Sequence, residues 1–479
     1  MESRGIFSNI SPLDHRYSLT DPGLFESLAA TLSEEASIRF CVRVEAALLA
    51  VLARRLPGVS GGPREREAIA ALESAVAPDE VYEEERKTQH NVRALVNVIK
   101  RHLPPSLSPL VHLGATSVDI LDTAAALRYK ETVRGVLLPI LLDLEEELAR
   151  RAREEADTPQ IGRTHGQHAV PLTFGFALAG YASRLGKSIA RMHAKAAGLR
   201  GKLSGAVGAY NATSLLVADP AGLEREFLAS LGLEPSECST QLAEPEYLLE
   251  LLLEINTAFG IIANLADDLR HLQRTEIGEV REEFAEAQVG SSTMPQKRNP
   301  WNSEHVKSLW KAFAPRALTF FMDQISEHQR DLTNSASARF VADYLAGFAS
   351  AAARMRAVMR SLGVNRSRMA QNLGLTGDLV FSEALYILIA AGGGLDAHES
   401  VRRATLRVEK EGGRLLDVLR ADAALWETLK AGLARAGISD AERFFADPSL
   451  YRGRAAEKAR EIADRYAELA ARIRGELAR

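Results

Sequence analysis

The chain is poor in the features that define several classes of protein. Its 479 residues include only two cysteines, Cys41 and Cys238, which form neither a CxxC pair nor a metal-ligand spacing. This excludes a disulfide scaffold and a cysteine-rich zinc fold, and it indicates reduced thiols in the cytoplasm. The net charge of -4 excludes a strongly basic surface for nucleic acid. The polar N-terminal segment contains no visible secretory signal.

A long uncharged apolar run is missing as well. The most apolar segment, residues 248–269, contains Glu250, Glu254, Asp267 and Asp268. Because carboxylates are costly inside a bilayer, we expect a packing helix here and no membrane partner. Hydrophobic residues at 46% and charged residues at 25% are typical of a globular protein.

Apolar/polar alternation and Asn-Gly turns are scarce, which argues against extended sheets. Apolar residues instead recur at helical spacing in several long segments. The clearest repeat alternates steps of four and three: Leu248, Leu252, Ile255, Phe259, Ile262, Ala266 and Leu269. Such a seam packs nearly parallel to neighbouring helices, and a chain with several seams has too many to cover alone. We therefore expect a homo-oligomeric bundle.

The predicted fold class is all-α, with three domains around a central bundle of long helices. Prolines mark the first boundary, and a change in composition at Gly363 marks the second. The expected domains are an N-terminal helical domain, residues 1–110, a central long-helix bundle and oligomerisation domain, residues 111–362, and a C-terminal helical domain, residues 363–479. Within the bundle we expect a polar elbow at residues 158–171 and a long helix from Glu304 to Phe320.

The segment GSSTMPQKRNP, residues 290–300, is rich in groups that bind anions. Two prolines and the Gly-Ser-Ser-Thr start forbid a regular helix, so we predict a mobile loop between two helices. Hydroxyl, ammonium and amide groups this close together suit the binding and deprotonation of an anionic substrate. The candidate site residues of this region are Ser291, Ser292, Met294, Lys297, Asn299 and Glu304.

Two other patterns fail the tests for cofactor and metal sites. Residues 186–188 (GKS) lack the earlier glycine of a phosphate-binding loop, because Tyr181 stands at that position. His165 and His168 are three residues apart, but no third Cys, His or carboxylate stands at a ligand spacing. We therefore expect no cofactor and no metal.

The loop at residues 290–300 resembles the signature loop of the fumarase/aspartase superfamily, whose members eliminate fumarate from succinyl-type substrates. Residues 114–119 (GATSVD) and the elbow around His165 also resemble superfamily regions, in the expected order. The resemblance covers essentially the whole chain. It implies a homotetramer in which matching segments of three different subunits meet at each active site.

Four further segments resemble the adenylosuccinate lyases within that superfamily. They are SPLDHRY at residues 11–17, KTQH at residues 87–90, the stretches at residues 205–211 and 240–241, and RDLTNS at residues 330–335 with Arg339 beyond. The chain departs from the family pattern at Asn91, where the family often has Asp. The resemblance places at the nucleotide substrate the residues Arg16, Tyr17, His90, Gln241, Arg330, Ser335 and Arg339. Forked guanidinium groups and a hydroxyl suit a phosphate monoester.

The implied reaction breaks the bond between the purine amino nitrogen and the succinyl carbon. It gives AMP and fumarate from adenylosuccinate, and the carboxamide ribotide and fumarate from its succinylated precursor. The resemblance implies Ser291 as base, His165 as acid, Glu304 as the group that orients His165, and Lys297 as a stabilising cation. The substrate contacts that complete the prediction are Thr116, Ser117, Thr164, Ser292, Met294 and Asn299.

Two rival interpretations stay open. An argininosuccinate lyase has the same fold and no phosphate to bind, so an assay with each succinyl substrate separates it from the first reading. A catalytically silent structural oligomer would keep the bundle without the chemistry. The presence of Ser291, His165, Lys297 and Glu304 together argues against the silent oligomer.

Overall fold

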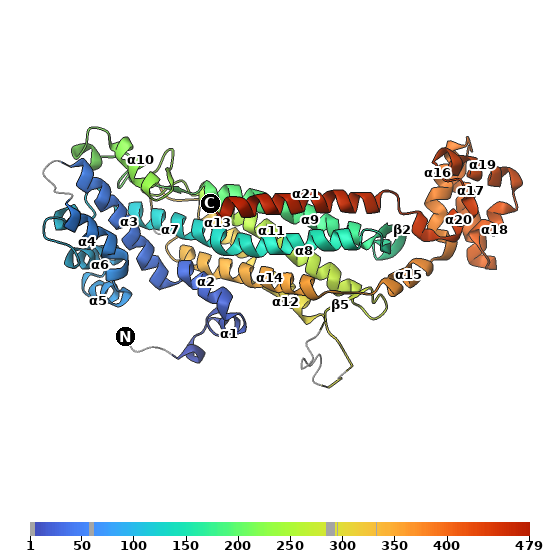
Figure 1. Ribbon diagram of the computed structural model, residues 1–479, viewed down its shortest axis with the longest axis horizontal. Coiled ribbons are helices and arrows are strands. Elements are labelled where there is room, and N and C mark those ends of the chain that lie inside the picture. Colours follow the sequence, from blue (N-terminus) through green and yellow to red (C-terminus); the bar gives the residue numbers. More distant parts are fainter. Residues whose placement is uncertain (1–4, 57–61, 284–292, 295, 332) are drawn as a thin grey trace.

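The molecule is elongated, with a bundle of long helices in the middle and smaller groups of helices at both ends (Figure 1). The computed structural model describes residues 5–56, 62–283, 293–294, 296–331 and 333–479. The N-terminal part of the chain consists of α1 (Arg16–Thr20), α2 (Pro22–Leu32), α3 (Glu34–Arg55), α4 (Pro63–Ala75), α5 (Pro78–Thr88) and α6 (Asn91–Arg101). Short 3-10 turns precede and follow these helices.

Helix α3 shows how local sequence sets these elements. The Ser33 side chain accepts a hydrogen bond from the Ala36 backbone N–H at 3.1 Å and so caps the helix start. Glu34 and Glu35 lie in the first turn, and Arg54 and Arg55 in the last, so both ends complement the helix dipole. The capped helix presents its apolar face to α7 and α4.

The central bundle is built around α11, whose predicted apolar seam is buried. Ile255, Phe259, Ile262 and Ala266 are fully buried, and α11 packs against α9, α12 and α14. Burial of each Ile or Phe side chain among them contributes about 1.5–3 kcal/mol. The helices of this part are α7 (Ser117–Thr132), α8 (Leu138–Glu154), α9 (Phe174–Ala197), α10 (Pro220–Ser230), α11 (Glu246–Leu272), α12 (Trp301–Phe313), α13 (Arg316–Met322) and α14 (Val341–Ser361).

Helix α11 is also long and apolar enough to cross a membrane by length and composition. In the folded chain, however, 61% of its most apolar window is buried inside the protein. Its apolar character therefore follows from its place in the core, as expected for a helix that carries several carboxylates.

The long helix predicted from Glu304 to Phe320 is wrong in one respect. It is divided into α12, which ends at Phe313, and α13, which begins at Arg316. Pro315 stands at the break because its ring cannot continue a helical hydrogen-bond ladder. Between α7 and α8 the chain forms a π-helical turn, Val133–Leu137, just before Pro139, the residue at which we expected a bend.

The predicted polar elbow is a β-hairpin. Strands β1 (Pro159–Thr164) and β2 (Gln167–Thr173) pair antiparallel and are joined by the two residues His165 and Gly166. The backbone angle φ is +53° at His165 and +74° at Gly166, as in a type I′ hairpin turn. The elbow was expected to contain no strands, and this was wrong. The turn is formed by His-Gly, so the search for Asn-Gly hairpin turns did not find it. Two smaller sheets pair β3 (Arg200–Gly201) with β4 (Glu234–Pro235), and β5 (Val280–Arg281) with β6 (Gly363–Val364).

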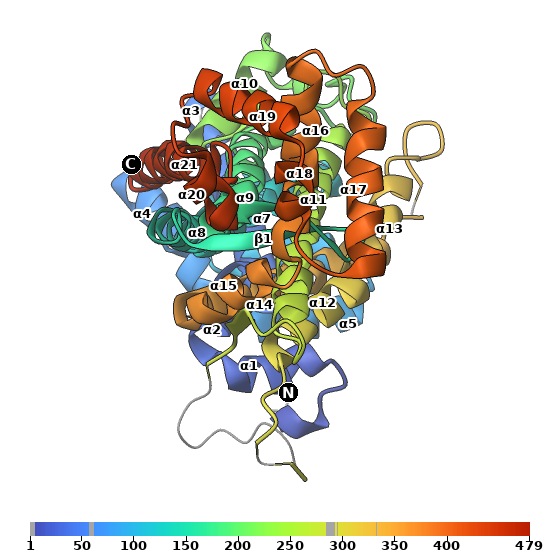
Figure 2. The ribbon, with the colours of Figure 1, turned by 90° about the vertical axis from the view of Figure 1, so that its right-hand side faces the viewer.

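The C-terminal end has its own apolar cluster, in which Phe381, Phe444 and Phe445 stack edge to face or tilted. Viewed along the long axis, these helices lie in front of the ends of the bundle helices (Figure 2). They are α15 (Arg366–Gly374), α16 (Ser382–Ala391), α17 (Ala397–Glu411), α18 (Leu415–Arg420), α19 (Ala423–Arg435) and α20 (Ala441–Ala446).

The final helix, α21 (Ala455–Leu477), returns along the bundle and packs against α8 and α9 (Figure 1). The predicted domain boundaries near residues 110 and 362 stay predictions. They group α21 with the C-terminal domain, although Ala459, Ala463, Ala470 and Ile473 belong to the apolar core of the bundle.

The bundle also buries a carboxyl group at Glu145 of α8, near Gly186 of α9 and the ring of Tyr466 on α21. Within the described residues, neither carboxylate oxygen has a hydrogen-bond partner. Burial raises the pKa of Glu145 well above its ordinary value of 4.5. The folded state therefore holds this proton more tightly than the unfolded chain does.

We expect Glu145→Met to stabilise the protein above pH 4.5 by on the order of 1–3 kcal/mol, the usual cost of an unsatisfied buried polar group. The raised pKa means that the wild-type carboxyl contributes a penalty that is absent below pH 4.5 and grows as pH rises toward the folded-state pKa. Urea unfolding from pH 4 to pH 8 measures the difference. The difference between wild type and Glu145→Met should grow from pH 4 to pH 8, and a constant difference across this range would contradict the account.

Candidate functional site

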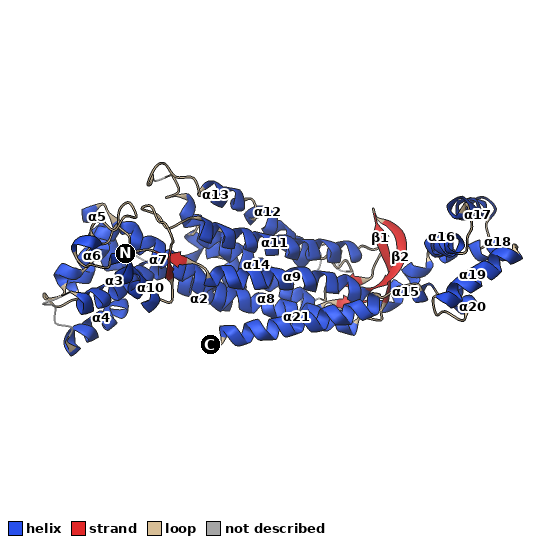
Figure 3. Cartoon of the chain, turned by 90° about the horizontal axis from the view of Figure 1, so that it is seen from above, coloured by secondary structure: helices blue, strands red, loops and turns tan. Residues whose placement is uncertain are grey.

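His165 lies at the tip of the β1–β2 hairpin, which projects between the bundle and the C-terminal helices (Figure 3). Thr164, His165, Gly166 and Gln167 are exposed, so the imidazole is presented to its surroundings. Strand β2 contacts the segment that follows α15, because His168 Nδ1 and Thr376 Oγ1 are 2.9 Å apart. Burial and the nearby Arg163 charge lower the pKa of His168, which favours a neutral ring in this contact.

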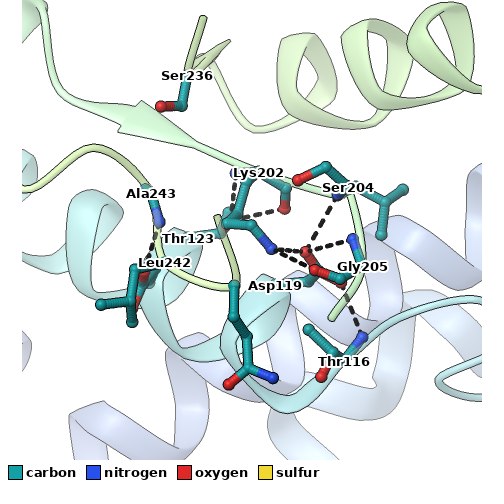
Figure 4. Close-up of polar contacts among 12 residues, drawn as sticks. Thr116, Asp119, Thr123, Lys202, Ser204, Gly205, Ser236, Leu242 and Ala243 are labelled. Carbon is teal, nitrogen blue, oxygen red and sulfur yellow. Dashed lines mark hydrogen bonds and ion pairs between the residues drawn. The ribbon is translucent and has the colours of Figure 1, made fainter. Parts of the chain in front are cut away.

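Thr116 and Ser117 lie at the start of α7, and Thr116 lies beside a buried ion pair (Figure 4). The Asp119 carboxylate accepts the Thr116 backbone N–H at 2.7 Å through Oδ2. Through Oδ1 it pairs with the Lys202 ammonium and accepts the Ser204 and Gly205 backbone N–H groups at 3.2 and 3.3 Å. Both side chains of the pair are fully buried. This cluster ties the start of α7 to the 202–205 segment.

Asp122, one turn further along α7, links this helix to a second segment. Its Oδ2 accepts the Ala243 backbone N–H at 2.9 Å, which fixes the segment that carries Gln241. Burial raises the pKa of Asp122 to about 6, and the Ala243 hydrogen bond together with the Lys202 and Arg330 charges opposes the shift. The helix that carries Thr116 and Ser117 therefore also positions Gln241.

Gln241 and Arg330 lie in contact, as the Arg330 guanidinium donates from Nη1 to the Gln241 Oε1 at 2.6 Å. Their main chains also meet, because the Gln241 N–H donates to the Gln329 carbonyl at 3.4 Å. Ser335 is exposed, and Arg339 lies in the 3-10 turn Ser337–Phe340, close enough to Tyr82 of α5 to affect its hydroxyl. The predicted phosphate-binding residues thus lie on the side of the bundle that faces the N-terminal helices.

His90 and Ser117 line one pocket of about 510 Å³ between the N-terminal helices and α7. His90 caps α6, because its Nδ1 accepts the Arg93 backbone N–H at 3.2 Å. His112 lines the same pocket with a left-handed backbone, φ +64°. Its Nδ1 is 2.6 Å from an oxygen of Glu45, a residue that is 1% exposed.

His112 was missed in the sequence. It is only four residues from Thr116 and belongs to the same polar segment, so its proximity to a predicted site residue was the available signal. A histidine anchored by a buried carboxylate and open to a pocket is a candidate for substrate contact.

Arg16 and Tyr17 open helix α1 and lie against the start of α12. The Tyr17 hydroxyl and His305 Nε2 are 2.9 Å apart, and the two rings are tilted with centroids 5.7 Å apart. Burial and the Arg354 and Arg16 charges lower the pKa of His305. His305 directly follows Glu304, which is exposed in the first turn of α12. The N-terminal residues of the predicted site thus lie near Glu304 within one chain.

The signature loop lies partly outside the described residues, which do not include Ser291 and Ser292. Met294, Lys297 and Asn299 are described: Met294 and Lys297 are exposed, and the Lys297 N–H donates to the Met294 carbonyl at 3.0 Å. The loop's second stem is held by Glu282, whose carboxylate accepts the Ser303 N–H and hydroxyl at 2.8 and 2.6 Å. The start of α12, including Glu304, is therefore fixed.

A single chain brings only some of the predicted site together. Arg330 joins Gln241, His90 joins Ser117, and Tyr17 joins the turn that carries Glu304. The hairpin with His165 and the start of α7 with Thr116 lie toward opposite ends of the bundle (Figures 1 and 3). Across the part of the chain that the structure describes, no hydrogen bond joins Glu304 to His165.

Comparison with known proteins identifies the family of the chain. Residues 65–311 match the family model described as "Lyase", and residues 326–437 match "Adenylosuccinate lyase C-terminal". The chain is 34% identical to an adenylosuccinate lyase of Pyrococcus abyssi, over 86% of this chain and 90% of that protein. It is 32% identical to an adenylosuccinate lyase of Archaeoglobus fulgidus, over 95% of this chain and 98% of that protein.

A solved structure shares the same architecture. The crystal structure of a fumarate lyase from Mesorhizobium sp. BNC1 superimposes with a TM-score of 0.77 at 24% identity, covering 93% of this chain and 98% of that one. The likeness confirms the all-α fold. The family match over residues 65–311 and the relatives above define a lyase of the fumarase/aspartase superfamily. The two curated relatives and the C-terminal match go further: the chain belongs to the adenylosuccinate lyase family.

Proposed function

We propose that this chain cleaves adenylosuccinate to AMP and fumarate, and its succinylated carboxamide ribotide analogue to the carboxamide ribotide and fumarate. A base removes the proton from the carbon beta to the departing nitrogen. The electron pair of that C–H bond forms the double bond of fumarate, the C–N bond breaks, and an acid protonates the nitrogen. The reaction needs neither a metal nor a redox step for its balance.

The roles follow from chemistry and sequence. Ser291 acts as base, with its alkoxide stabilised by Lys297, and His165 acts as acid, oriented by Glu304 of another subunit. Removal of the proton moves charge into a carboxylate, which Thr116, Ser117 and Asn299 bind. Thr164, Ser292 and Met294 also contact the succinyl part of the substrate. Arg16, Tyr17 and His90 contact its nucleotide part.

The contact between Arg330 and Gln241 carries this proposal. Their 2.6 Å hydrogen bond places a guanidinium suited to phosphate beside an amide suited to a carboxylate. A substrate that bears both groups fits such a pair, whereas argininosuccinate has no phosphate. Fumarate release from adenylosuccinate and from argininosuccinate by the purified protein tests the choice. Release from argininosuccinate alone would select the rival enzyme, and no release from either would revive the silent oligomer.

We expect Arg330→Ala to weaken AMP binding by about 10- to 100-fold, because a hydrogen bond to a charged group contributes about 1.5–3 kcal/mol. Fumarate affinity should change by less than about 3-fold, since the lost guanidinium serves the phosphate. Calorimetric titration of each product measures both constants. Arg316, whose guanidinium pairs with Asp343, offers a matched control on a neighbouring helix. Equal weakening of AMP and fumarate would argue against a phosphate site.

We propose a homotetramer in which each site draws residues from several subunits. Enzymes of this superfamily act on small molecules and are generally oligomeric. Two features support assembly: the separation of His165 from Thr116 in one chain, and exposed apolar side chains on and after α13. These side chains are Leu318, Phe321, Met322 and Ile325, each more than half exposed. An exposed free thiol at Cys238 supports a cytoplasmic location.

A further inference from the structure

Glu279 lies at a junction of three elements and is fully buried. It stands between the end of α11 and strand β5, the first stem of the signature loop. Its Oε1 accepts hydrogen bonds from Arg163 Nη2 at 2.6 Å and from Asn372 Nδ2 at 2.8 Å. Its Oε2 accepts from Gln160 Nε2 at 2.7 Å and from Arg163 Nη1 at 3.2 Å. One carboxylate thus holds β1 and α15 together.

The hairpin is shaped to make this contact. Successive residues of a regular strand point to opposite faces, so residues 160 and 163 would not reach the same group. The pairing of β1 with β2 shifts register between Ile161 and Arg163, and this bulge turns both side chains toward Glu279. Gly162 permits the bulge, because a Cβ there would lie 2.7 Å from the Val170 carbonyl oxygen.

The Arg163 contact is close to the tip of the hairpin. Arg163 pairs with His168 across the strands, and the next pair, Thr164 with Gln167, closes directly onto His165 and Gly166. A forked guanidinium bound by both oxygens of a carboxylate has its orientation fixed as well as its distance. Residues 164–167 at the tip of the hairpin are all exposed. The Arg163 contact therefore gives this exposed tip a rigid base.

The geometry points to Glu279 as a positioning residue for His165, acting through Arg163. The inference rests on the proposed role of His165 as the acid. Because Glu279 leads into β5, the same carboxylate links the hairpin that carries His165 to the first stem of the signature loop. Misplacement of a reacting group by about 1 Å costs about 100-fold in rate, so a fixed hairpin base matters for turnover more than for substrate binding.

The test is Glu279→Gln, which keeps the side-chain size and removes the charge that faces Arg163. We expect kcat to fall about 10- to 100-fold with KM within about 3-fold of wild type. Glu276→Gln is the matched control: Glu276 lies three residues earlier, is exposed, pairs with Arg274, and should leave kcat unchanged. Equal kcat values for Glu279→Gln and wild type would overturn the inference.

A double-mutant cycle separates positioning from general damage. His165→Gln should be nearly inactive, and adding Glu279→Gln to it should change kcat by less than about 2-fold. The same 10- to 100-fold loss in both backgrounds would overturn the inference, whereas full activity of His165→Gln would overturn the role of His165 itself. Should Glu279→Gln not fold, Arg163→Lys keeps the charge but removes the fork. It should lower kcat and leave KM, and an unchanged kcat would overturn the inference.

Discussion

Replacing Ser291 by alanine is expected to lower kcat by about 10²- to 10⁴-fold, the usual contribution of a positioned acid or base. The proton beta to the departing nitrogen would then have no group to receive it. Adenylosuccinate should still bind, because the phosphate and carboxylate contacts come from other residues, among them Arg330 and Gln241. Fumarate release measures turnover, and calorimetry with the inactive variant measures substrate affinity.

Ser292→Ala is the comparison that identifies the base. The neighbouring hydroxyl is assigned to substrate binding, so its loss should raise KM and leave kcat within about 3-fold of wild type, since removal of uniform binding acts on KM. A larger fall in kcat for Ser292→Ala than for Ser291→Ala would exchange the two roles. Near-normal turnover of Ser291→Ala would remove Ser291 from the mechanism.

The helices of the bundle could be predicted from periodicity, and the hairpin could not. The seam of α11 repeats along the helix and is buried from Leu252 to Leu269, whereas Leu248 at its start is only partly buried. The β1–β2 hairpin gives no such repeat, because both strands are short and partly exposed, and its turn depends on a left-handed His165. Pro315 was visible in the sequence, but the apolar spacing on either side of it favoured one continuous helix.

Site residues could be predicted where several of them occur together in one sequence segment. They could not be predicted where their role depends on contacts between distant segments. Arg330 and Gln241 were assigned separately, and the structure shows that they touch. Glu45 and Glu279 carry no local signal, since each is one glutamate on or beside a helix. Their importance comes from burial and from partners 67 and 116 residues away, His112 and Arg163. Such pairs require the fold to be known.

The buried pair between Lys202 and Asp119 should have the largest effect on stability. Asp119 accepts four donors, three of them backbone N–H groups, in a place from which water is excluded. Lys202→Met removes the only one of these donors that carries charge. We expect the free energy of unfolding to fall by about 3–5 kcal/mol, as when one member of a buried pair is lost. The 202–205 segment and the start of α7, with Thr116 and Ser117, should loosen together.

Two further variants decide whether burial is the cause. Lys195 pairs with Glu250 at 2.6 Å, but that carboxylate is largely exposed, so Lys195→Met should cost no more than about 1 kcal/mol. Asp119→Asn added to Lys202→Met removes the unpaired charge while keeping a carbonyl oxygen for Ser204 and Gly205, and it should recover part of the loss. Urea unfolding at one fixed protein concentration measures all three variants, because assembly contributes to apparent stability. If Lys202→Met costs no more than Lys195→Met, the pair is not what holds the start of α7 to the 202–205 segment.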